Sequence, residues 1–104
     1  MKEKSNLNTP LFEKNMIKTS ITIINQLGLH ARASAKFVST ASKFISEIKV
    51  TKGTQTINGK SIMAIMMLAA SKGSELTLEI NGEDEEAMEK AIVDLINNRF
   101  GEAE

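Results

Sequence analysis

The sequence contains no cysteine, tryptophan or tyrosine, and only one proline and one histidine. Without cysteine the chain cannot form disulfides or hold a metal through thiolates, and a single histidine argues against a structural zinc site. We therefore expect no bound metal. The lack of tryptophan and tyrosine removes the best platforms for stacking nucleic-acid bases, so we also expect no nucleic-acid partner.

Long hydrophobic runs are missing as well. No apolar stretch approaches the length of a membrane span, and the first residues lack the apolar region of a signal peptide. We expect a cytoplasmic protein that does not insert into a membrane. The 104 residues, 41% of them hydrophobic, are enough for one compact domain. Its core must be built from aliphatic side chains, methionine and four phenylalanines.

The formal net charge is zero, but the charges are unevenly distributed. Residues 1–82 contain 11 Lys/Arg and 5 Asp/Glu, whereas residues 83–104 contain 2 and 8. This pattern predicts a basic body, which could attract acidic partners, and a separate, solvated acidic face at the end. A plain effect on solubility would explain the same asymmetry.

Hydrophobic periodicity predicts a domain at residues 16–104, preceded by an extension at 1–15 that has no sustained period. We expect this extension to be mobile, although it could also pack as a short arm. Alternating residues predict strands at 16–24, 47–51, 55–57 and 75–80. Helical spacing predicts helices over 30–45, over 60–70 and from 84 onward.

The buried stripes of the two longer helices can be named from the spacing. In the first helix they are Phe37, Val38, Ala41, Phe44 and Ile45. In the last helix they are Ala87, Met88, Ala91, Ile92, Leu95 and Ile96. Because polar residues alternate with apolar ones along each strand, helices should cover only one side of the sheet. The β-α-β-β-α-β-α order then predicts an α+β open-faced sandwich.

The single histidine lies in the stretch Asn25-Gln26-Leu27-Gly28-Leu29-His30-Ala31-Arg32-Ala33-Ser34, between a turn and a helix. If His30 is the N-cap, the N–H groups of Ala31 and Arg32 point into the space beside its ring. A helix N-terminus attracts phosphate, and the guanidinium of Arg32 can bind its oxygens. An imidazole nitrogen can attack phosphorus and later leave it again.

These properties indicate a residue that accepts and returns a phosphoryl group. No carboxylate lies near His30 in the sequence to activate water, so a shuttle fits better than hydrolysis. The simpler alternative is that a lone histidine is a surface or packing residue.

Two other stretches invite a functional interpretation. Residues 53–61 end in Gly-Lys-Ser, but five residues separate the two glycines instead of the four of a P-loop. We reject a nucleotide site there and expect Ser61 to cap a helix. The following helix has too many apolar residues for one buried face. Ile65, Leu68 and Ala69 suit the core, which leaves Ile62, Met63 and Met66 either in the core or exposed for docking.

Three motifs resemble the HPr family, the histidine phosphocarriers of the bacterial phosphoenolpyruvate-dependent phosphotransferase system. They are Gly28-Leu29-His30-Ala31-Arg32-Ala33, Gly59-Lys60-Ser61-Ile62-Met63 and Gly82-Glu83-Asp84-Glu85, in matching order and spacing over about residues 16–101. The resemblance implies a four-stranded antiparallel sheet covered on one side by three helices. It implies a carrier rather than an enzyme, active as a monomer and needing no metal or cofactor on this chain.

The resemblance also implies a role for each matching residue. His30 would take a phosphoryl group on Nδ1 from enzyme I and pass it to an EIIA-type domain in sugar uptake or its regulation, with Arg32 neutralising the phosphoryl charge. Ser61 would be the regulatory target of an HPr kinase/phosphorylase. Ile62, Met63 and Met66 would form the patch on which partners dock.

One departure from the family pattern concerns the helix start. Most members have Pro-Ala after His-Ala-Arg, whereas this chain has Ala33-Ser34. The same form resembles the nitrogen-related branch (NPr) and some proteobacterial HPr proteins more than the sugar-dedicated ones, so a regulatory phosphocarrier without sugar transport is an alternative. A third possibility is a binding module that uses this fold without phosphorylation.

Overall fold

The computed structural model describes residues 16–104, so the predicted extension at 1–15 lies outside the described residues. In chain order, the elements are β1 (Met16–Thr22), α2 (Ala31–Ala41), β2 (Glu47–Lys52), β3 (Gln55–Asn58), α3 (Ile62–Met67), β4 (Glu75–Asn81), α4 (Glu85–Asn97) and the 3-10 turn η1 (Arg99–Gly101). The predicted order of strands and helices is confirmed, and only η1 was not predicted.

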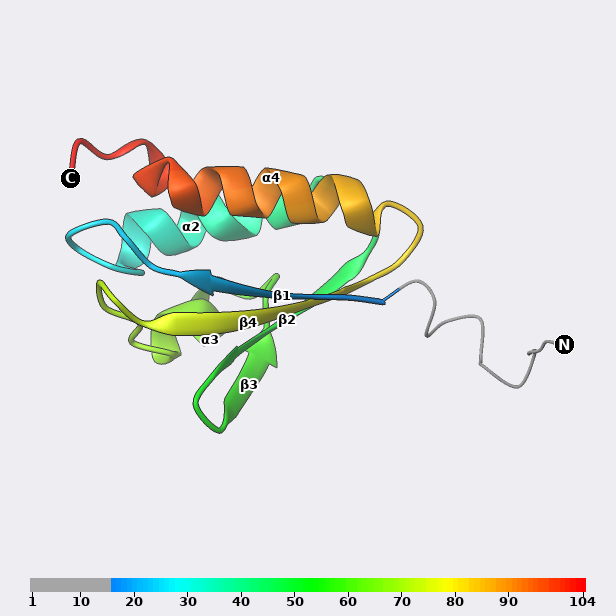
Figure 1. Ribbon diagram of the computed structural model, residues 1–104, viewed down its shortest axis with the longest axis horizontal. Coiled ribbons are helices and arrows are strands. Elements are labelled where there is room, and N and C mark those ends of the chain that lie inside the picture. Colours follow the sequence, from blue (N-terminus) through cyan, green and yellow to red (C-terminus); the bar gives the residue numbers. More distant parts are fainter. Residues whose placement is uncertain (1–15) are drawn as a thin grey trace, which may run out of the picture.

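The four strands form one antiparallel sheet in the order β1-β4-β2-β3. Ile80 of β4 stands between two partners, Ile17 of β1 and Ile48 of β2. Successive residues of a strand point to opposite faces, so this register places one apolar row across the sheet. The long helices α2 and α4 lie side by side over that face (Figure 1).

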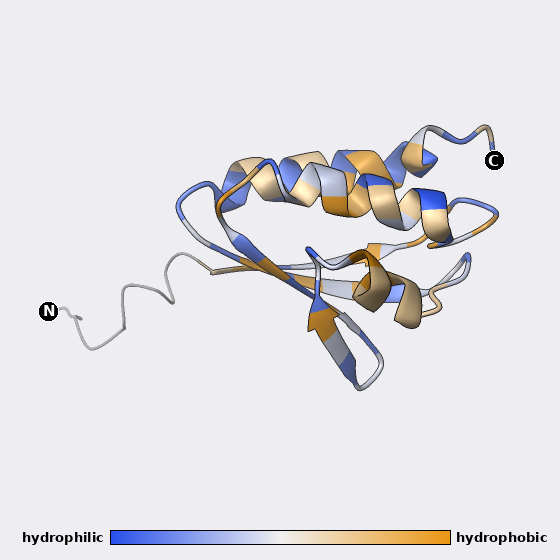
Figure 2. Cartoon of the chain, turned by 180° about the vertical axis from the view of Figure 1, so that it is seen from behind, coloured by the Kyte–Doolittle hydropathy of each residue, from blue (hydrophilic) through white to orange (hydrophobic). Residues whose placement is uncertain are grey.

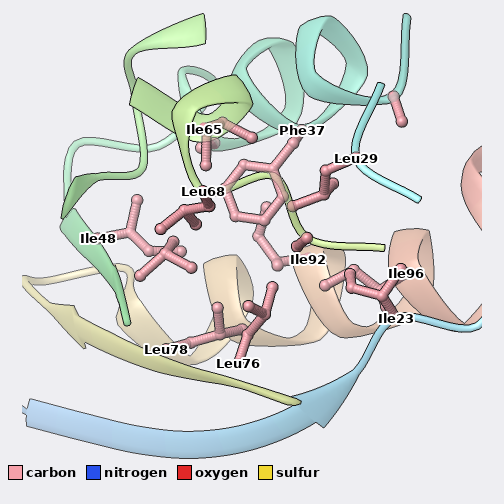
Figure 3. Close-up of a cluster of buried hydrophobic side chains, with 14 of the residues drawn as sticks. Ile23, Leu29, Phe37, Ile48, Ile65, Leu68, Leu76, Leu78, Ile92 and Ile96 are labelled. Carbon is pink, nitrogen blue, oxygen red and sulfur yellow. The ribbon is translucent and has the colours of Figure 1, made fainter. Parts of the chain in front are cut away.

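The core fills the space between the sheet and the helices. Phe37 of α2, Ile65 of α3 and Ile92 of α4 are fully buried and point toward one another (Figure 3). All three helices therefore contribute to a single core on one face of the sheet. The predicted α+β open-faced sandwich is confirmed.

The first helix was predicted to reach residue 45, but α2 ends at Ala41. The N–H of Ile45 donates to Oδ2 of Asp84 at 3.0 Å, and this contact draws the chain away from the helix. Ile45 is 72% exposed, so its placement in the buried stripe was wrong. Phe44 remains partly buried against the core.

Other buried positions were also assigned wrongly. Ala69 lies after the end of α3 with φ at 50° and is exposed, whereas its neighbour Ala70 is buried. Ala87 in the first turn of α4 is exposed too. Strand β1 ends at Thr22 instead of residue 24, since the N–H of Ile23 bonds to the carbonyl of Ser74 in the loop before β4, at 2.9 Å. These differences all lie at element ends, where the chain changes direction.

Helix α3 differs from the two long helices because it is hydrophobic over its whole length (Figure 2). Only Ile65 within it is buried. Within residues 16–104, no helix is long and apolar enough to span a membrane.

Candidate functional site

His30 is the N-cap of α2, as predicted. Its backbone is extended (φ −75°, ψ −178°), and its carbonyl accepts the N–H of Ser34 at 2.8 Å. The imidazole makes no capping hydrogen bond to the helix. The N–H groups of Ala31 and Arg32 belong to the first turn, where an α-helix provides no acceptor for them. The helix start is thus left open to an anion beside the ring.

The turn before His30 is held tightly against the loop that precedes β4. Gly28 has φ at +68°, and a Cβ there would lie 2.5 Å from the carbonyl oxygen of Ala70. The N–H of Leu29 donates to that same oxygen at 2.8 Å. The hydroxyl of Ser34, which is fully buried, donates to the carbonyl of Leu29 at 3.1 Å. The backbone on both sides of His30 is therefore fixed.

The imidazole contacts a carboxylate that the sequence interpretation missed. Nε2 of His30 is hydrogen-bonded to Oε2 of Glu102, and the other oxygen, Oε1, accepts Nδ2–H of Asn25 at 3.0 Å. Asn25 is fully buried and also donates to the carbonyl of Gly28 at 2.9 Å. The acidic end was expected to form a separate solvated face, and for Glu102 that prediction was wrong.

The environment of Glu102 favours its charged form. Desolvation raises the pKa of this carboxyl, but hydrogen bonds from Asn25 and His30, with the positive charge of Lys36 and that of His30 when its ring is protonated, outweigh it and lower the pKa below the usual value. Glu102 is therefore ionised near neutral pH, and an ionised carboxylate only accepts hydrogen bonds.

An open cavity of about 660 Å³ adjoins the ring. It is lined by Gln26, Leu27, His30, Arg32, Glu102, Ala103 and Glu104. Arg32 is exposed, and within residues 16–104 its guanidinium makes no hydrogen bond or ion pair. Leu27 is 70% exposed, which gives the rim an apolar contact that was not predicted. The structure thus brings the two predicted residues His30 and Arg32 to one cavity.

Ser61 lies at the start of α3 and caps it, as predicted. Its Oγ accepts the N–H of Ala64 at 3.2 Å. The ammonium of Lys60 donates to the carbonyl of Phe44 at 2.7 Å, so it is not turned into the Gly59 loop as a P-loop lysine would be. The rejection of a nucleotide site there agrees with this geometry.

The surface beyond Ser61 is apolar. Ile62 and Met66 are each 43% exposed, and Met63 is 74% exposed. Met67, which was not predicted to belong to this surface, is 67% exposed. Of the two alternatives left open by the sequence, exposure is the one observed. We call Ile62, Met63, Met66 and Met67 the α3 patch.

Within residues 16–104, no three His, Cys, Asp or Glu side chains are grouped so that they could hold a metal ion. Asn25 and Glu102 were missed because their contacts join residues far apart in the chain. The pair His30 and Glu102 is separated by 72 positions, and the residues around Glu102 have no periodic pattern that would indicate the contact.

Comparison with known proteins identifies the family of this chain. Residues 17–98 match the family model described as the PTS HPr component phosphorylation site. The phosphocarrier protein HPr of Neisseria meningitidis serogroup A is 60% identical over 89 residues, covering 86% of this chain and all of that protein. The HPr of Cupriavidus necator is 51% identical over the same share of each chain.

Solved structures give the same assignment. HPr-C-His from Thermoanaerobacter tengcongensis has a TM-score of 0.81 and 50% identity, covering 85% of this chain and 99% of that one. An HPr dimer from the same organism has a TM-score of 0.67 and 54% identity, over 79% and 94% of the two chains. The family model spans residues 17–98, which include His30, the three helices and the four strands apart from Met16. On these grounds the chain belongs to the HPr family of phosphocarrier proteins, which are carriers rather than enzymes.

Proposed function

We propose that His30 accepts a phosphoryl group from phosphorylated enzyme I on Nδ1 and passes it to an EIIA-type domain. The observation that carries this proposal is the position of His30. Its ring stands at an open helix start and lines a cavity together with Arg32. The family membership makes phosphoryl transfer the relevant chemistry.

The transfer requires no cofactor on this chain. The lone pair of Nδ1 forms a bond to phosphorus while the bond from phosphorus to the donor histidine breaks, and that electron pair stays on the donor ring. In the second transfer, an acceptor attacks phosphorus, the N–P bond breaks, and its electron pair returns to Nδ1. Arg32 and the N–H groups of Ala31 and Arg32 offset the charge of the phosphoryl oxygens.

Glu102 does not turn this site into a hydrolase. Its carboxylate contacts Nε2, and the two ring nitrogens point away from each other, so it is not placed to activate water at Nδ1. The lack of a base near His30 in the sequence favours a phosphoryl shuttle over hydrolysis. The position of Glu102 at Nε2 is consistent with a shuttle as well.

The test is incubation with enzyme I and phosphoenolpyruvate, followed by intact-mass measurement. We expect an acid-labile gain of one phosphoryl group in the wild type and none in His30→Ala. The reverse step is tested by adding an EIIA-type domain and following loss of the label. No mass gain, or a gain that persists in His30→Ala, would leave the chain as a binding module without phosphotransfer.

We also propose that the α3 patch docks these partners and that Ser61 regulates the docking. Ser61 immediately precedes Ile62 and Met63, so a phosphate on its hydroxyl would introduce charge at the edge of an apolar contact. An HPr kinase/phosphorylase is the proposed modifying enzyme. An acid-stable phosphate that disappears in Ser61→Ala is the expected result. If it persists in that variant, Ser61 is only a helix cap.

The Ala33-Ser34 sequence favours the nitrogen-related branch as the second candidate function. In that case the phosphocarrier would regulate rather than feed sugar uptake. The measurement that separates the two is a comparison of transfer rates to sugar-specific and nitrogen-related EIIA domains. We propose a monomer as the acting state, which light scattering at the concentrations used for transfer will test against a dimer.

A further inference from the structure

The segment after α4 folds back onto the turn that carries His30. Arg99, Phe100 and Gly101 all have positive φ values of 56°, 55° and 79°, which reverse the chain. Phe100 is fully buried, and its carbonyl accepts Nζ–H of Lys36 of α2 at 2.7 Å. These contacts fix the position from which residue 102 departs.

The end of this segment is tied to the turn by further hydrogen bonds. The N–H of Gln26 donates to the main-chain oxygen of Glu104 at 2.6 Å. Between these anchors, one oxygen of Glu102 accepts from buried Asn25, and the other oxygen meets Nε2 of His30. The carboxylate is thus held in place before any phosphoryl group arrives.

We infer that Glu102 is a positioning residue for His30, whose carboxylate holds the proton on Nε2 and so leaves the lone pair on Nδ1 for the phosphoryl group. This inference rests on the proposed function of His30. It explains why the phosphoryl group is bound by Nδ1 rather than by Nε2. Because an ionised carboxylate can only accept hydrogen bonds, Nε2 must carry the proton of this hydrogen bond. In a neutral imidazole the other nitrogen is then unprotonated.

The same contact stabilises the positive charge that appears on the His30 ring during transfer. When Nδ1 bonds to phosphorus and Nε2 keeps its proton, the ring becomes a cation. The carboxylate of Glu102 faces that cation from the opposite side of the ring. A carboxylate that orients a histidine and stabilises its cation is an established arrangement in the Ser-His-Asp triad of serine proteases. No proton has to leave the ring in either direction of transfer.

The test uses Glu102→Gln in the full chain, with Glu75→Gln as the control. Both variants remove one negative charge, but the Glu102 side chain contacts His30, whereas Glu75 is an exposed residue of β4 that does not line the cavity. The first readout is the ¹⁵N chemical shifts of the His30 ring in the unphosphorylated protein. Amide spectra of both variants check that the fold is retained, and Glu102→Ala serves as a second variant.

We expect the wild type and Glu75→Gln to show a protonated Nε2 and a bare Nδ1, and Glu102→Gln and Glu102→Ala to show a mixture of tautomers. The second readout is the rate of phosphoryl acceptance from enzyme I, which should fall by roughly 10-fold in Glu102→Gln and stay near wild type in Glu75→Gln.

Identical ring spectra, or equal rates, in Glu102→Gln and Glu75→Gln would overturn the inference and leave the phosphocarrier function standing. If the wild type itself accepts no phosphoryl group, the proposed function fails, whatever the tautomer of the ring. The two failures are therefore distinguishable.

Discussion

The backbone N–H of Ser46 donates to Oδ1 of Asp84 at 2.9 Å, and the hydroxyl of Ser46 donates to the same oxygen. This contact joins the residue before β2 to the N-cap of α4. Asp84 makes no capping hydrogen bond to its own helix, so its carboxylate serves the neighbouring loop. The carboxylate of Asp84 therefore links the N-terminal end of α4 to the start of β2.

The first prediction concerns stability in acid. The Ser46 hydroxyl, together with the N–H groups of Ile45 and Ser46, lowers the pKa of Asp84 in spite of desolvation. A lowered folded-state pKa adds stability that is present above the unfolded value, about 3.9, and is lost as the pH falls through the folded value. Asp84→Asn should therefore lower the melting temperature at pH 7 and flatten its fall below about pH 4.

The control is Asp94→Asn, which removes an equal charge from an exposed pair with Lys90 at 3.1 Å. Such a pair contributes roughly 0.3–0.5 kcal/mol, so the melting temperature should change little. Thermal melts of the three proteins between pH 2 and pH 7 (about the range of carboxylate titration) give the comparison. If the acid limb of Asp84→Asn is as steep as that of the wild type, the proposed contribution of Asp84 is wrong.

The second prediction concerns Gly28. In Gly28→Ala the new Cβ would meet the carbonyl of Ala70 and Cα of Ser71, at 2.5 and 2.8 Å, on a backbone with φ at +68°. Gly53→Ala is the matched control, because Gly53 has φ at +61° with nothing within 4 Å. The left-handed backbone costs both variants about 1–2 kcal/mol. The collision should cost Gly28→Ala roughly 1–3 kcal/mol more, measured by urea unfolding.

Phosphoryl acceptance separates the two glycine variants further. Because Gly28 lies two residues before His30, relief of the collision should move the turn and slow acceptance from enzyme I. Gly53→Ala should accept at the wild-type rate. Equal unfolding free energies for the two variants would show that the contact between the turn and Ala70 is not tight.

The third prediction concerns Ala33. Its N–H lies in the first turn of α2, where the helix offers no acceptor, so Ala33→Pro removes a donor near the phosphoryl group without breaking a helical hydrogen bond. We expect the fold to be retained and the phosphohistidine to be shorter-lived by about twofold, equivalent to a barrier change of about 0.4 kcal/mol. The measurement is the hydrolysis rate of the purified phosphoprotein. In denaturant, variant and wild type should hydrolyse at one rate, and an unchanged lifetime in the folded state would refute the effect.

The fourth prediction separates docking from stability. Met63 is 74% exposed, so Met63→Ala should leave the melting temperature nearly unchanged. If the α3 patch docks enzyme I, the same change should raise the KM for this protein by roughly fivefold or more. Ile45→Ala is the control, because Ile45 is 72% exposed but lies beside Asp84. A KM that rises equally in both variants would argue against a dedicated docking surface.

The sequence alone predicted what depends on local periodicity. Alternation located the four strands, and helical spacing found Met88, Ile92 and Ile96 as buried residues of α4, all confirmed. The N-caps His30 and Ser61 were predicted as well, since turn chemistry and helix starts are local signals.

The predictions failed where distant segments compete with the local pattern. The spacing alone allows Ile45 to continue the buried stripe of α2, but Asp84, 39 residues away, takes its N–H. The acidic composition of the last residues indicated solvation, yet the turn at Phe100 carries Glu102 to His30. Nothing near either residue in the sequence encodes these contacts.

The separation of His30 and Glu102 along the sequence determines when this hydrogen bond can form during synthesis. The two residues are separated by 72 positions, so His30 leaves the ribosome well before its partner. Until residue 102 emerges and Phe100 enters the core, the ring can place its proton on either nitrogen. A chain that stops short of residue 102 would keep His30 and Arg32 but lose the group that selects Nδ1.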